Sequence, residues 1–307
     1  MHALSETSPN GSLQENEWQF SGEENDLIKG EMMISALTSF KERVFITADT
    51  LLDRHDYAIM DKYGIIGKPL GHSFSPDFFN QKFKCENIDA VYEKYELPQI
   101  DALTEVLDSN PELRGLNVTI PYKQAVMNYL DEISEEAYAI GAVNVVRITH
   151  SGNKIHTKGF NSDVIGFTRS IEPLLEKHHK KALILGTGGA SHAIEYGLRK
   201  LGLDAIKVSR SAKHGTILYE NITPDVVHEY NVIVNCTPVG MYPHTEDCPQ
   251  LPYSALDNHN LLYDLIYNPD ETMFMKKGKS VGAVVKNGLE MLLLQAYASW
   301  EFWHSAD

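Results

Sequence analysis

The glycine cluster at residues 186–191 has the residue types and spacing to bind a phosphate-containing cofactor. It reads Gly-Thr-Gly-Gly-Ala-Ser, follows the apolar run at residues 183–185, and precedes a helix-compatible stretch. This pattern predicts a buried strand that turns sharply into a helix. Because glycine lacks a Cβ, Gly186 can make the turn, while Gly188 and Gly189 let a pyrophosphate reach the backbone N–H groups at the positive helix end. The alternative is a glycine-rich turn that binds nothing.

A second strand, about twenty residues further along, indicates which dinucleotide would bind. The strand at residues 205–208 is followed by Ser209, Arg210 and Ser211. An arginine in this position suits a ribose with a 2′-phosphate, whereas a carboxylate would accept the free ribose hydroxyl of NAD. The guanidinium offers paired donors to a phosphate, and the serines add hydroxyls. We therefore expect NADP rather than NAD. The alternative for Arg210 is an ordinary surface arginine.

Lys123 and Asp163 are the candidates for proton transfer. Asn117 and Thr119 lie on one face of an expected strand, which Pro121 ends. Pro121 can also open a helix, which would place Lys123 in its first turn. A lysine is unusual there because the positive helix end repels it, and proton transfer would explain its presence. Asp163 lies at a strand-to-helix junction, where it is either the helix N-cap or the carboxylate partner of Lys123. The alternative for Lys123 is a solvated surface lysine.

Three further polar side chains are candidates for contact with a small substrate. A helix can start at Pro76 with Ser75 as its N-cap. Ser73 and Ser75 are two residues apart, so in an extended segment their hydroxyls point the same way and suit a polyhydroxylated or carboxylated molecule. Asn144 is an amide within residues 139–146, which we expect to form an otherwise apolar strand. A buried amide needs partners, and a substrate is one candidate.

The apolar runs indicate the elements that position these residues. Strands are expected at residues 63–67, 90–96, 113–120, 139–146, 154–163, 183–185, 205–208, 232–235, 261–265 and 283–285. Helices are expected from Pro76 and at residues 100–107, 164–171, 193–198 and 289–303. Strands alternating with helices predict an α/β protein. The loop after residues 232–235 follows a carboxyl end, where open parallel sheets bind ligands.

Composition and charge exclude several classes of protein. The chain has 307 residues, 43% of them hydrophobic, and a formal net charge of -15. This charge argues against binding to nucleic acid or to an acidic membrane surface. No apolar run approaches the roughly 20 residues of a transmembrane helix, and no secretory signal is evident. The three cysteines share no metal-ligand spacing, so we expect reduced thiols in a cytoplasmic protein and no metal site.

Nine motifs, taken in order, resemble the shikimate dehydrogenases. The resemblance runs from Met60 to the end of the chain, and the ordered set is highly specific. The motifs lie at residues 71–76 (Gly-His-Ser-Phe-Ser-Pro), 117–123 (Asn-Val-Thr-Ile-Pro-Tyr-Lys), 141–144 (Gly-Ala-Val-Asn), 159–163 (Gly-Phe-Asn-Ser-Asp), 186–191, 235–241, 264–269, 287–292 and 295–296.

The resemblance implies NADPH-dependent reduction of 3-dehydroshikimate to shikimate, in the pathway to aromatic amino acids. It implies that Lys123 and Asp163 are the catalytic pair. The implied substrate-binding residues are Ser73, Ser75, Asn117, Thr119, Asn144, Tyr267 and Gln295. The implied NADP(H)-binding residues are Gly186, Thr187, Gly188, Gly189, Ala190, Ser209, Arg210, Ser211, Thr237, Met241, Leu265 and Gly288. No metal is implied, and the protein would be a monomer or a homodimer.

The implied architecture is two α/β domains flanking a cleft, the second a Rossmann-like NADP-binding domain with a parallel sheet. The substrate-binding domain would comprise residues 60–163 and 286–307, and the NADP-binding domain residues 164–285. Residues 1–59 are expected to be a largely disordered or loosely packed extension, because their first part is polar with few apolar residues.

Two departures from the family pattern leave alternatives open. Val164 replaces the usual glycine after the aspartate, and Ser162 replaces the usual threonine before it. The second basic residue after Arg210 falls at His214, with Lys213 beside it, so a 2′-phosphate clamp there could depend on pH. One alternative is therefore a quinate/shikimate dehydrogenase that uses NAD. The other is a non-catalytic NADP-binding regulator of the same fold.

Overall fold

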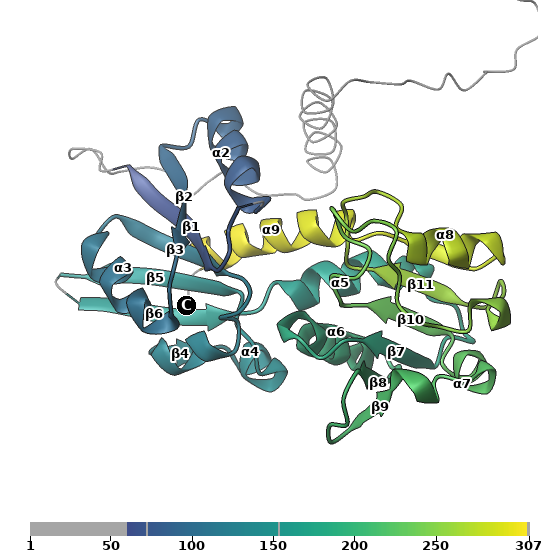
Figure 1. Ribbon diagram of the computed structural model, residues 1–307. Coiled ribbons are helices and arrows are strands. Elements are labelled where there is room, and N and C mark those ends of the chain that lie inside the picture. The colour runs from purple at the N-terminus through teal and green to yellow at the C-terminus, as the bar shows by residue number, and fades with distance from the viewer. Residues whose placement is uncertain (1–59, 72, 153, 306–307) are drawn as a thin grey trace, which may run out of the picture. The chain divides into compact units, whose positions relative to one another are not determined.

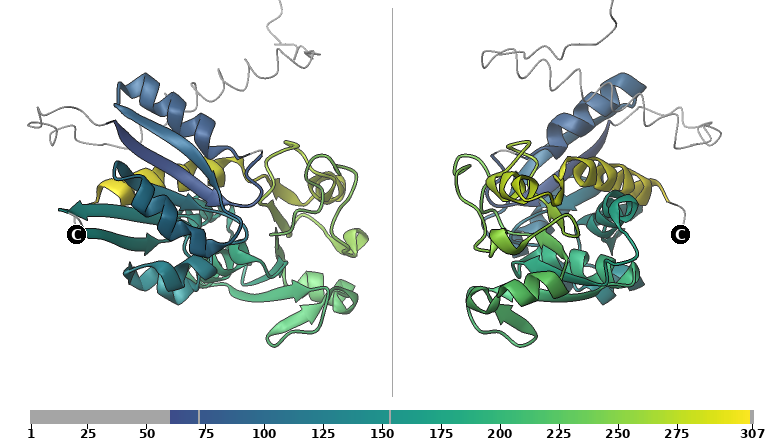
Figure 2. Two further views of the ribbon diagram at one scale, coloured as in Figure 1. Left: turned by 60° about the vertical axis from the view of Figure 1, so that its left-hand side comes forward. Right: turned by 90° about the vertical axis from the view of Figure 1, so that its right-hand side faces the viewer.

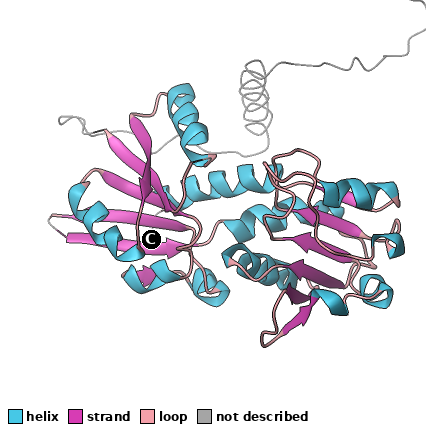
Figure 3. Cartoon of the chain, in the orientation of Figure 1, coloured by secondary structure: helices cyan, strands magenta, loops and turns pink. Residues whose placement is uncertain are grey.

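The described part of the chain folds into two six-stranded sheets with helices packed against them (Figures 1 and 3). The computed structural model describes residues 60–71, 73–152 and 154–305. The extension predicted over residues 1–59 lies outside these ranges. The described residues belong to a single compact unit, Ile59–Asp307. The predicted α/β fold is confirmed.

The first sheet is mixed and has the strand order β2-β1-β3-β5-β6-β4. Its strands are β1 (Asp61–Gly67), β2 (Ala90–Glu96), β3 (Leu113–Val118), β4 (Glu132–Ile133), β5 (Val145–Ser151) and β6 (Lys154–Phe160). β1 pairs in parallel with β2 and β3, and β4 pairs in parallel with β6. β5 runs antiparallel to β3 and β6, so β5 and β6 form a hairpin.

The second sheet is parallel throughout and has the order β12-β11-β10-β7-β8-β9. Its strands are β7 (Lys181–Leu185), β8 (Asp204–Ser209), β9 (Thr216–Leu218), β10 (Val232–Asn235), β11 (Leu261–Asp264) and β12 (Val284–Lys286). Parallel strands covered on both faces are apolar along their whole length, which explains the continuous runs at β7 and β10. Ile184 and Val234 pack on one face, and Leu183 and Ile233 pack on the other.

The helices connect the strands and cover both sheets. They are α2 (Ser75–Glu86), α3 (Leu103–Ser109), α4 (Glu135–Ile140), α5 (Asp163–Ile171), α6 (Gly189–Lys200), α7 (Pro224–Glu229), α8 (Met273–Ser280) and α9 (Leu289–His304). Short 3₁₀ segments are η1 (Ile100–Ala102), η2 (Ala125–Tyr129), η3 (Glu172–Leu174), η4 (Tyr219–Asn221) and η5 (Tyr253–Ala255). α2 lies beside β1 and β2 (Figure 2), where the ring of Phe79 stacks on Tyr92 at 4.9 Å.

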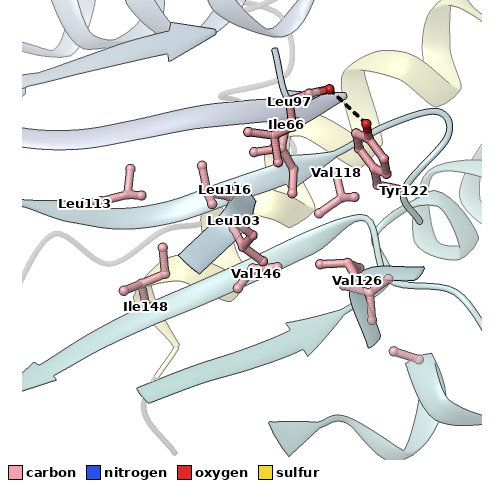
Figure 4. Packing of buried hydrophobic residues seen from close by; sticks show 12 residues of the cluster. Ile66, Leu97, Leu103, Leu113, Leu116, Val118, Tyr122, Val126, Val146 and Ile148 are labelled. Atoms are coloured by element: carbon pink, nitrogen blue, oxygen red, sulfur yellow. Dashed lines mark hydrogen bonds between the residues drawn. The ribbon is translucent and has the colours of Figure 1, made fainter. Parts of the chain in front are cut away.

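One face of the first sheet is a closely packed apolar core (Figure 4). Its members include Leu116, Val118 and Val146 from the central strands. Tyr122 joins this core, and its hydroxyl donates to the Leu97 carbonyl at 2.8 Å. The segment that follows β3 is therefore held down on the core just before Lys123.

Helix α9 joins the two sheets (Figure 1). It packs against β3 and β5 of the first sheet and against α5, whose apolar side chains belong to the core of the second sheet. Near its start, Met291 packs into the core of the second sheet. A Cβ on Gly166 of α5 would lie 2.6 Å from the Met291 carbonyl, so the backbones of α5 and α9 cross closely there. Near its end, Trp303 lies over Gly115 of β3, and its Nε1 donates to the Val146 carbonyl at 3.2 Å. The carboxyl-terminal part of α9 therefore packs against the first sheet.

The prediction of a strand over residues 139–146 is wrong in its first half. Residues 139 and 140 end α4, whose N-cap Ser134 accepts a hydrogen bond from the Ala137 N–H at 3.3 Å. Gly141, with a φ of 72°, ends this helix in the left-handed conformation that glycine adopts without strain. β5 begins only at Val145, so Asn144 precedes the strand.

The helix predicted to open at Pro121 is also absent. The chain turns there instead, with the Tyr122 N–H bonded to the Thr119 carbonyl at 2.9 Å. Helical structure resumes only at η2, and Lys123 lies in the turn before it. Lys123 is therefore placed by this turn and not by the first turn of a helix.

The start of α2 differs from the prediction by one residue. Ser75 is the first helical residue, because the Phe78 N–H already bonds the Phe74 carbonyl at 3.2 Å. Phe74 has helical φ and ψ angles and is the N-cap. Ser75 is thus not the N-cap, and the segment from Ser73 to Ser75 is not extended. The Ser75 side chain is consequently available for other partners.

Candidate active site

A cavity of about 320 Å³ collects the residues that the motifs predicted. It opens where β1 and β3 end and where the loops after β11 and β12 begin. All nine predicted catalytic and substrate-binding residues line it: Ser73, Ser75, Asn117, Thr119, Lys123, Asn144, Asp163, Tyr267 and Gln295. Three of the predicted cofactor-binding residues also line it, namely Ala190, Leu265 and Gly288.

Lys123 and Asp163 form an ion pair at the wall of this cavity. Nζ of Lys123 lies 2.6 Å from Oδ2 of Asp163, and their side chains are 15% and 9% exposed. Oδ1 of Asp163 accepts from Nδ2 of Asn144 at 2.8 Å. Charge-assisted hydrogen bonds of this length are among the stronger ones in proteins. The carboxylate therefore holds the ammonium group in one place beside the cavity.

The side-chain amides of Asn117 and Asn144, which line the cavity, have buried hydrogen-bond partners. Asn144 also donates to Oγ of Ser162 at 3.0 Å and accepts from the Ser162 N–H at 2.7 Å. Asn117 accepts from the Tyr92 hydroxyl at 2.7 Å and donates to Oγ of Ser299 at 3.0 Å. These side chains therefore have partners within the protein and keep one orientation before any ligand binds.

Several residues of this site were given no role by the sequence motifs, although Phe74, Val118, Met291 and Leu292 lie within them. Ile65, Phe74, Val118, Met291 and Leu292 also line the cavity and give it an apolar wall. Tyr92 and Ser299 lie beneath it without lining it. The strand pattern had indicated Tyr92 only as a strand residue, and Ser299 lies in a helix whose apolar pattern suggested packing alone.

The glycine loop has the features that a pyrophosphate requires. Gly186 has a φ of 109°, so the predicted turn needs glycine. No side chain caps the amino end of α6 at Gly188. A Cβ on Gly188 would meet nothing within 4 Å, which leaves room for a phosphate against the backbone. A Cβ on Gly189 would lie 3.4 Å from Cβ of Lys123, so the loop borders the ion pair.

The other predicted cofactor residues follow the carboxyl ends of the parallel strands. Gly186 and Thr187 follow β7, Ser209 ends β8, and Thr237 lies in the loop after β10. The remaining ones do not line the cavity: Gly188, Arg210, Ser211 and Met241 lie in the loops at the same edge, and Gly189 begins α6. Arg210 is exposed, and Nζ of Lys213 reaches Oγ1 of Thr187 at 3.0 Å. A basic group is therefore present between the glycine loop and the segment after β8.

Asp264 is a buried carboxyl group at the end of β11 that the motifs did not assign to the site. Oδ1 accepts from Nδ2 of Asn235 at 3.0 Å and from the Ile266 N–H at 3.1 Å, and Oδ2 accepts from Thr272 at 2.7 Å. Asn235 in turn accepts from the N–H of Thr237 at 3.0 Å. Burial raises the pKa of Asp264 to about 6. This carboxyl group ties the loops after β10 and β11 together.

The raised pKa of Asp264 predicts how the free energy of unfolding changes with pH. The folded state binds its proton more tightly than the unfolded state, so its contribution favours folding at about pH 4 and is lost as the pH rises through about 6. Asp264→Asn should remove this decline, which amounts to about 2 kcal/mol above about pH 4.5. Urea unfolding of both proteins between about pH 4.5 and pH 8 measures it, and parallel stability curves would contradict the prediction.

The described residues hold no group of three or more histidine, cysteine, aspartate or glutamate side chains that could bind a metal ion. The three cysteines, Cys85, Cys236 and Cys248, are all free. Within the ranges that the structure describes, no helix combines the length and apolarity needed to cross a membrane.

Comparison with known proteins identifies the family. The model of the shikimate dehydrogenase substrate binding domain matches residues 65–146. A shikimate dehydrogenase (NADP(+)) from Bacillus cereus is 36% identical over 259 residues, which cover 78% of this chain and 91% of that protein. Among solved structures, a chorismate mutase/shikimate 5-dehydrogenase fusion protein from Clostridium acetobutylicum is 36% identical, with a TM-score of 0.69 and coverage of 81% of this chain and 93% of the other.

The structure of shikimate 5-dehydrogenase from Thermus thermophilus in complex with NADP(H) and shikimate is also similar. It is 30% identical, with a TM-score of 0.69, and the match covers 80% of this chain and 94% of that one. The ordered motifs, the two sheets and the polar cavity therefore agree with the similarity to known proteins. This chain belongs to the shikimate dehydrogenase family.

Proposed function

We propose that the chain catalyses the reversible NADPH-dependent reduction of 3-dehydroshikimate to shikimate, as a step of aromatic amino acid biosynthesis. The observation that carries this proposal is the Lys123–Asp163 ion pair, which lies in a polar cavity next to the glycine loop. The relatives named as shikimate dehydrogenases (NADP(+)) support the substrate and the cofactor.

The proposed chemistry needs one proton from the protein. When bound, NADPH supplies the hydride to the ketone carbon. Lys123 then donates a proton from Nζ to the oxygen as negative charge develops there, which yields the alcohol, and the lysine regains its proton from solvent. Asp163 keeps the ammonium group in position, and Asn144 holds Asp163. In the oxidation of shikimate the same groups act in reverse.

Substrate binding is proposed for the seven polar residues that share the cavity with this pair. Ser73, Ser75 and Asn117 offer hydroxyl and amide groups on one side, and Tyr267 and Gln295 offer theirs from the loop after β11 and from α9. Burial raises the pKa of Tyr267, which keeps the phenol a neutral donor. Thr119 and Asn144 complete the set.

Cofactor binding is proposed along the carboxyl edge of the second sheet. The glycine loop would hold the pyrophosphate, and Arg210, with Ser209 and Ser211, would hold the 2′-phosphate. Thr237, Met241, Leu265 and Gly288 would lie against the nicotinamide half. We assign residues 60–163 and 286–307 to a substrate-binding domain and residues 164–285 to the NADP-binding domain. We propose a cytoplasmic protein, which its three free thiols support, and a monomer or homodimer.

The assay is cofactor reduction followed at 340 nm, with shikimate or quinate as substrate and NADP⁺ or NAD⁺ as cofactor. We expect the highest kcat/KM for shikimate with NADP⁺. Faster turnover of quinate with NAD⁺ would instead identify the chain as a quinate/shikimate dehydrogenase. No turnover with any pair, despite NADP binding, would reject the enzyme and leave a regulator that kept the fold.

A further inference from the structure

A network of buried hydrogen bonds lies next to the cavity, and its members converge on Ser299. This serine is on α9, is fully buried, and does not line the cavity. Its Oγ lies 3.0 Å from Nδ2 of Asn117 and 3.0 Å from Oγ of Ser162. It also lies 2.8 Å from the carbonyl of Gln295, one helical turn earlier. Three segments distant in the sequence therefore converge on one hydroxyl.

The donor and the acceptor can be assigned for the hydrogen bonds of this network. Burial raises the pKa of Tyr92 well above its ordinary value, so the phenol keeps its proton and donates it to Oδ1 of Asn117. This sets the Asn117 amide with Nδ2 toward Ser299. Ser299 can donate its single hydrogen to the Gln295 carbonyl, the nearest acceptor, at 2.8 Å. Its two lone pairs then accept from Asn117 and from Ser162.

The hydrogen bonds that lead from Ser299 through Ser162 to Asp163 can be assigned in the same way. Because Ser299 donates to the Gln295 carbonyl, Ser162 gives its hydrogen to Ser299 at 3.0 Å, which is nearer than its other acceptor, Oε1 of Gln295 at 3.4 Å. The Ser162 oxygen then accepts from Nδ2 of Asn144 at 3.0 Å. The second hydrogen of that Nδ2 goes to Oδ1 of Asp163 at 2.8 Å. The Asn144 oxygen accepts from the Ser162 N–H at 2.7 Å, which excludes the flipped amide. The hydroxyl of Ser299 is thus linked to the carboxylate that holds Lys123.

We propose that Ser299 is a positioning residue that fixes the orientation of two cavity-lining amides, Asn117 and Asn144. This inference deepens the proposed function and rests on it for its effect on substrate. Ser299 touches neither the cavity nor the reacting atoms, and it acts through the side chains that do. An alanine in its place removes the nearest acceptor of both donors in a fully buried place. Nδ2 of Asn117 is then left with the Asn144 carbonyl at 3.3 Å, and Ser162 with Oε1 of Gln295 at 3.4 Å, so both lose hydrogen-bond energy or rotate.

The test compares Ser299→Ala with Ser170→Ala. Ser170 on α5 is also buried, its hydroxyl bonds that of Tyr263 at 2.8 Å, and it does not line the cavity. We expect Ser299→Ala to raise KM for shikimate by about 10-fold and to leave KM for NADP⁺ within about 2-fold. Ser170→Ala should lower the thermal midpoint by a similar amount without changing either KM.

A second readout does not depend on turnover. The side-chain amide resonances of Asn117 and Asn144 in ¹H–¹⁵N NMR spectra of the full chain should shift in Ser299→Ala and stay unchanged in Ser170→Ala. Unchanged amide resonances in Ser299→Ala would overturn the positioning role, as would an unchanged KM for shikimate. Absence of turnover by the unmodified protein would reject the proposed function alone, because the resonances still decide the role of Ser299.

Discussion

Replacing Lys123 with alanine is expected to lower kcat for shikimate oxidation by about 10²–10⁴-fold, the usual contribution of a positioned acid–base group. The loss follows from geometry, since Nζ of Lys123 is the cation that Asp163 holds beside the cavity, at 2.6 Å. Binding of NADP⁺, measured by calorimetry, should change little, because no assigned phosphate contact involves this side chain. Steady-state kinetics over pH 6 to about 10 gives kcat.

Lys62→Ala is the matched control for this substitution. Lys62 also belongs to a partly buried ion pair, with Glu112 at 2.5 Å, but it lies at the start of β1 and does not line the cavity. The Lys62→Ala protein should lose some stability and keep the kcat of the unmodified protein. Asp163→Asn should lower kcat in the same direction as Lys123→Ala. A Lys123→Ala protein that kept kcat within a factor of about 3 would exclude lysine as the proton donor.

Replacing Gly288 with alanine is expected to damage both binding functions at once. An added Cβ would lie 2.1 Å from the Leu265 carbonyl oxygen and 2.5 Å from its carbon, and neither backbone atom can rotate away. The loop after β11, which carries Leu265 and Tyr267, must then move away from the amino end of α9. A displacement of about 1 Å in a positioning element can cost about 10² in rate. We expect kcat/KM to fall by about that factor for shikimate and for NADP⁺.

Gly71→Ala provides the control for a glycine-to-alanine change. Gly71 is exposed, and an added Cβ would meet nothing within 4 Å. Its kinetics and thermal midpoint should match those of the unmodified protein. The Gly288→Ala protein should also lose about 1–3 kcal/mol of stability, which chemical denaturation measures. Unchanged kinetics in Gly288→Ala would show that the loop relaxes without moving Tyr267, and would remove Gly288 from the site.

Local patterns were sufficient wherever a residue's role depends on its neighbours in the chain. The run before Gly186 is apolar at every position because β7 is covered on both faces, so it could be recognised as a buried strand. The turn at Gly186 required a conformation that few other residues adopt. For the same reason the strands β8 and β10 were predicted close to their observed bounds.

The predictions failed where two local interpretations competed. Residues 139–146 are apolar enough for a strand, but Ser134 and Gly141 cap a short helix that takes the first of them. Pro121 is compatible with a helix start, but the bond from Tyr122 to the Thr119 carbonyl and the packing of its ring make a turn there. In both cases a cap or a tertiary contact of modest energy decided between conformations that the residues alone permit.

The sequence by itself determined the order of the longer strands and helices, the glycine turn, and the residue types that reach the cavity, because these depend on periodicity and on single backbone conformations. It did not predict the short strands β4 and β9 or the helices α4, α7 and α8. Only the tertiary structure decided which side chains meet. Asn117 and Ser299 are 182 residues apart in the chain, and Lys123 and Asp163 are 40 apart. No local pattern carries such a contact, since it arises from strand pairing and from the packing of α9 across both sheets. The roles of Ser299 and Asp264 became visible only in that packing.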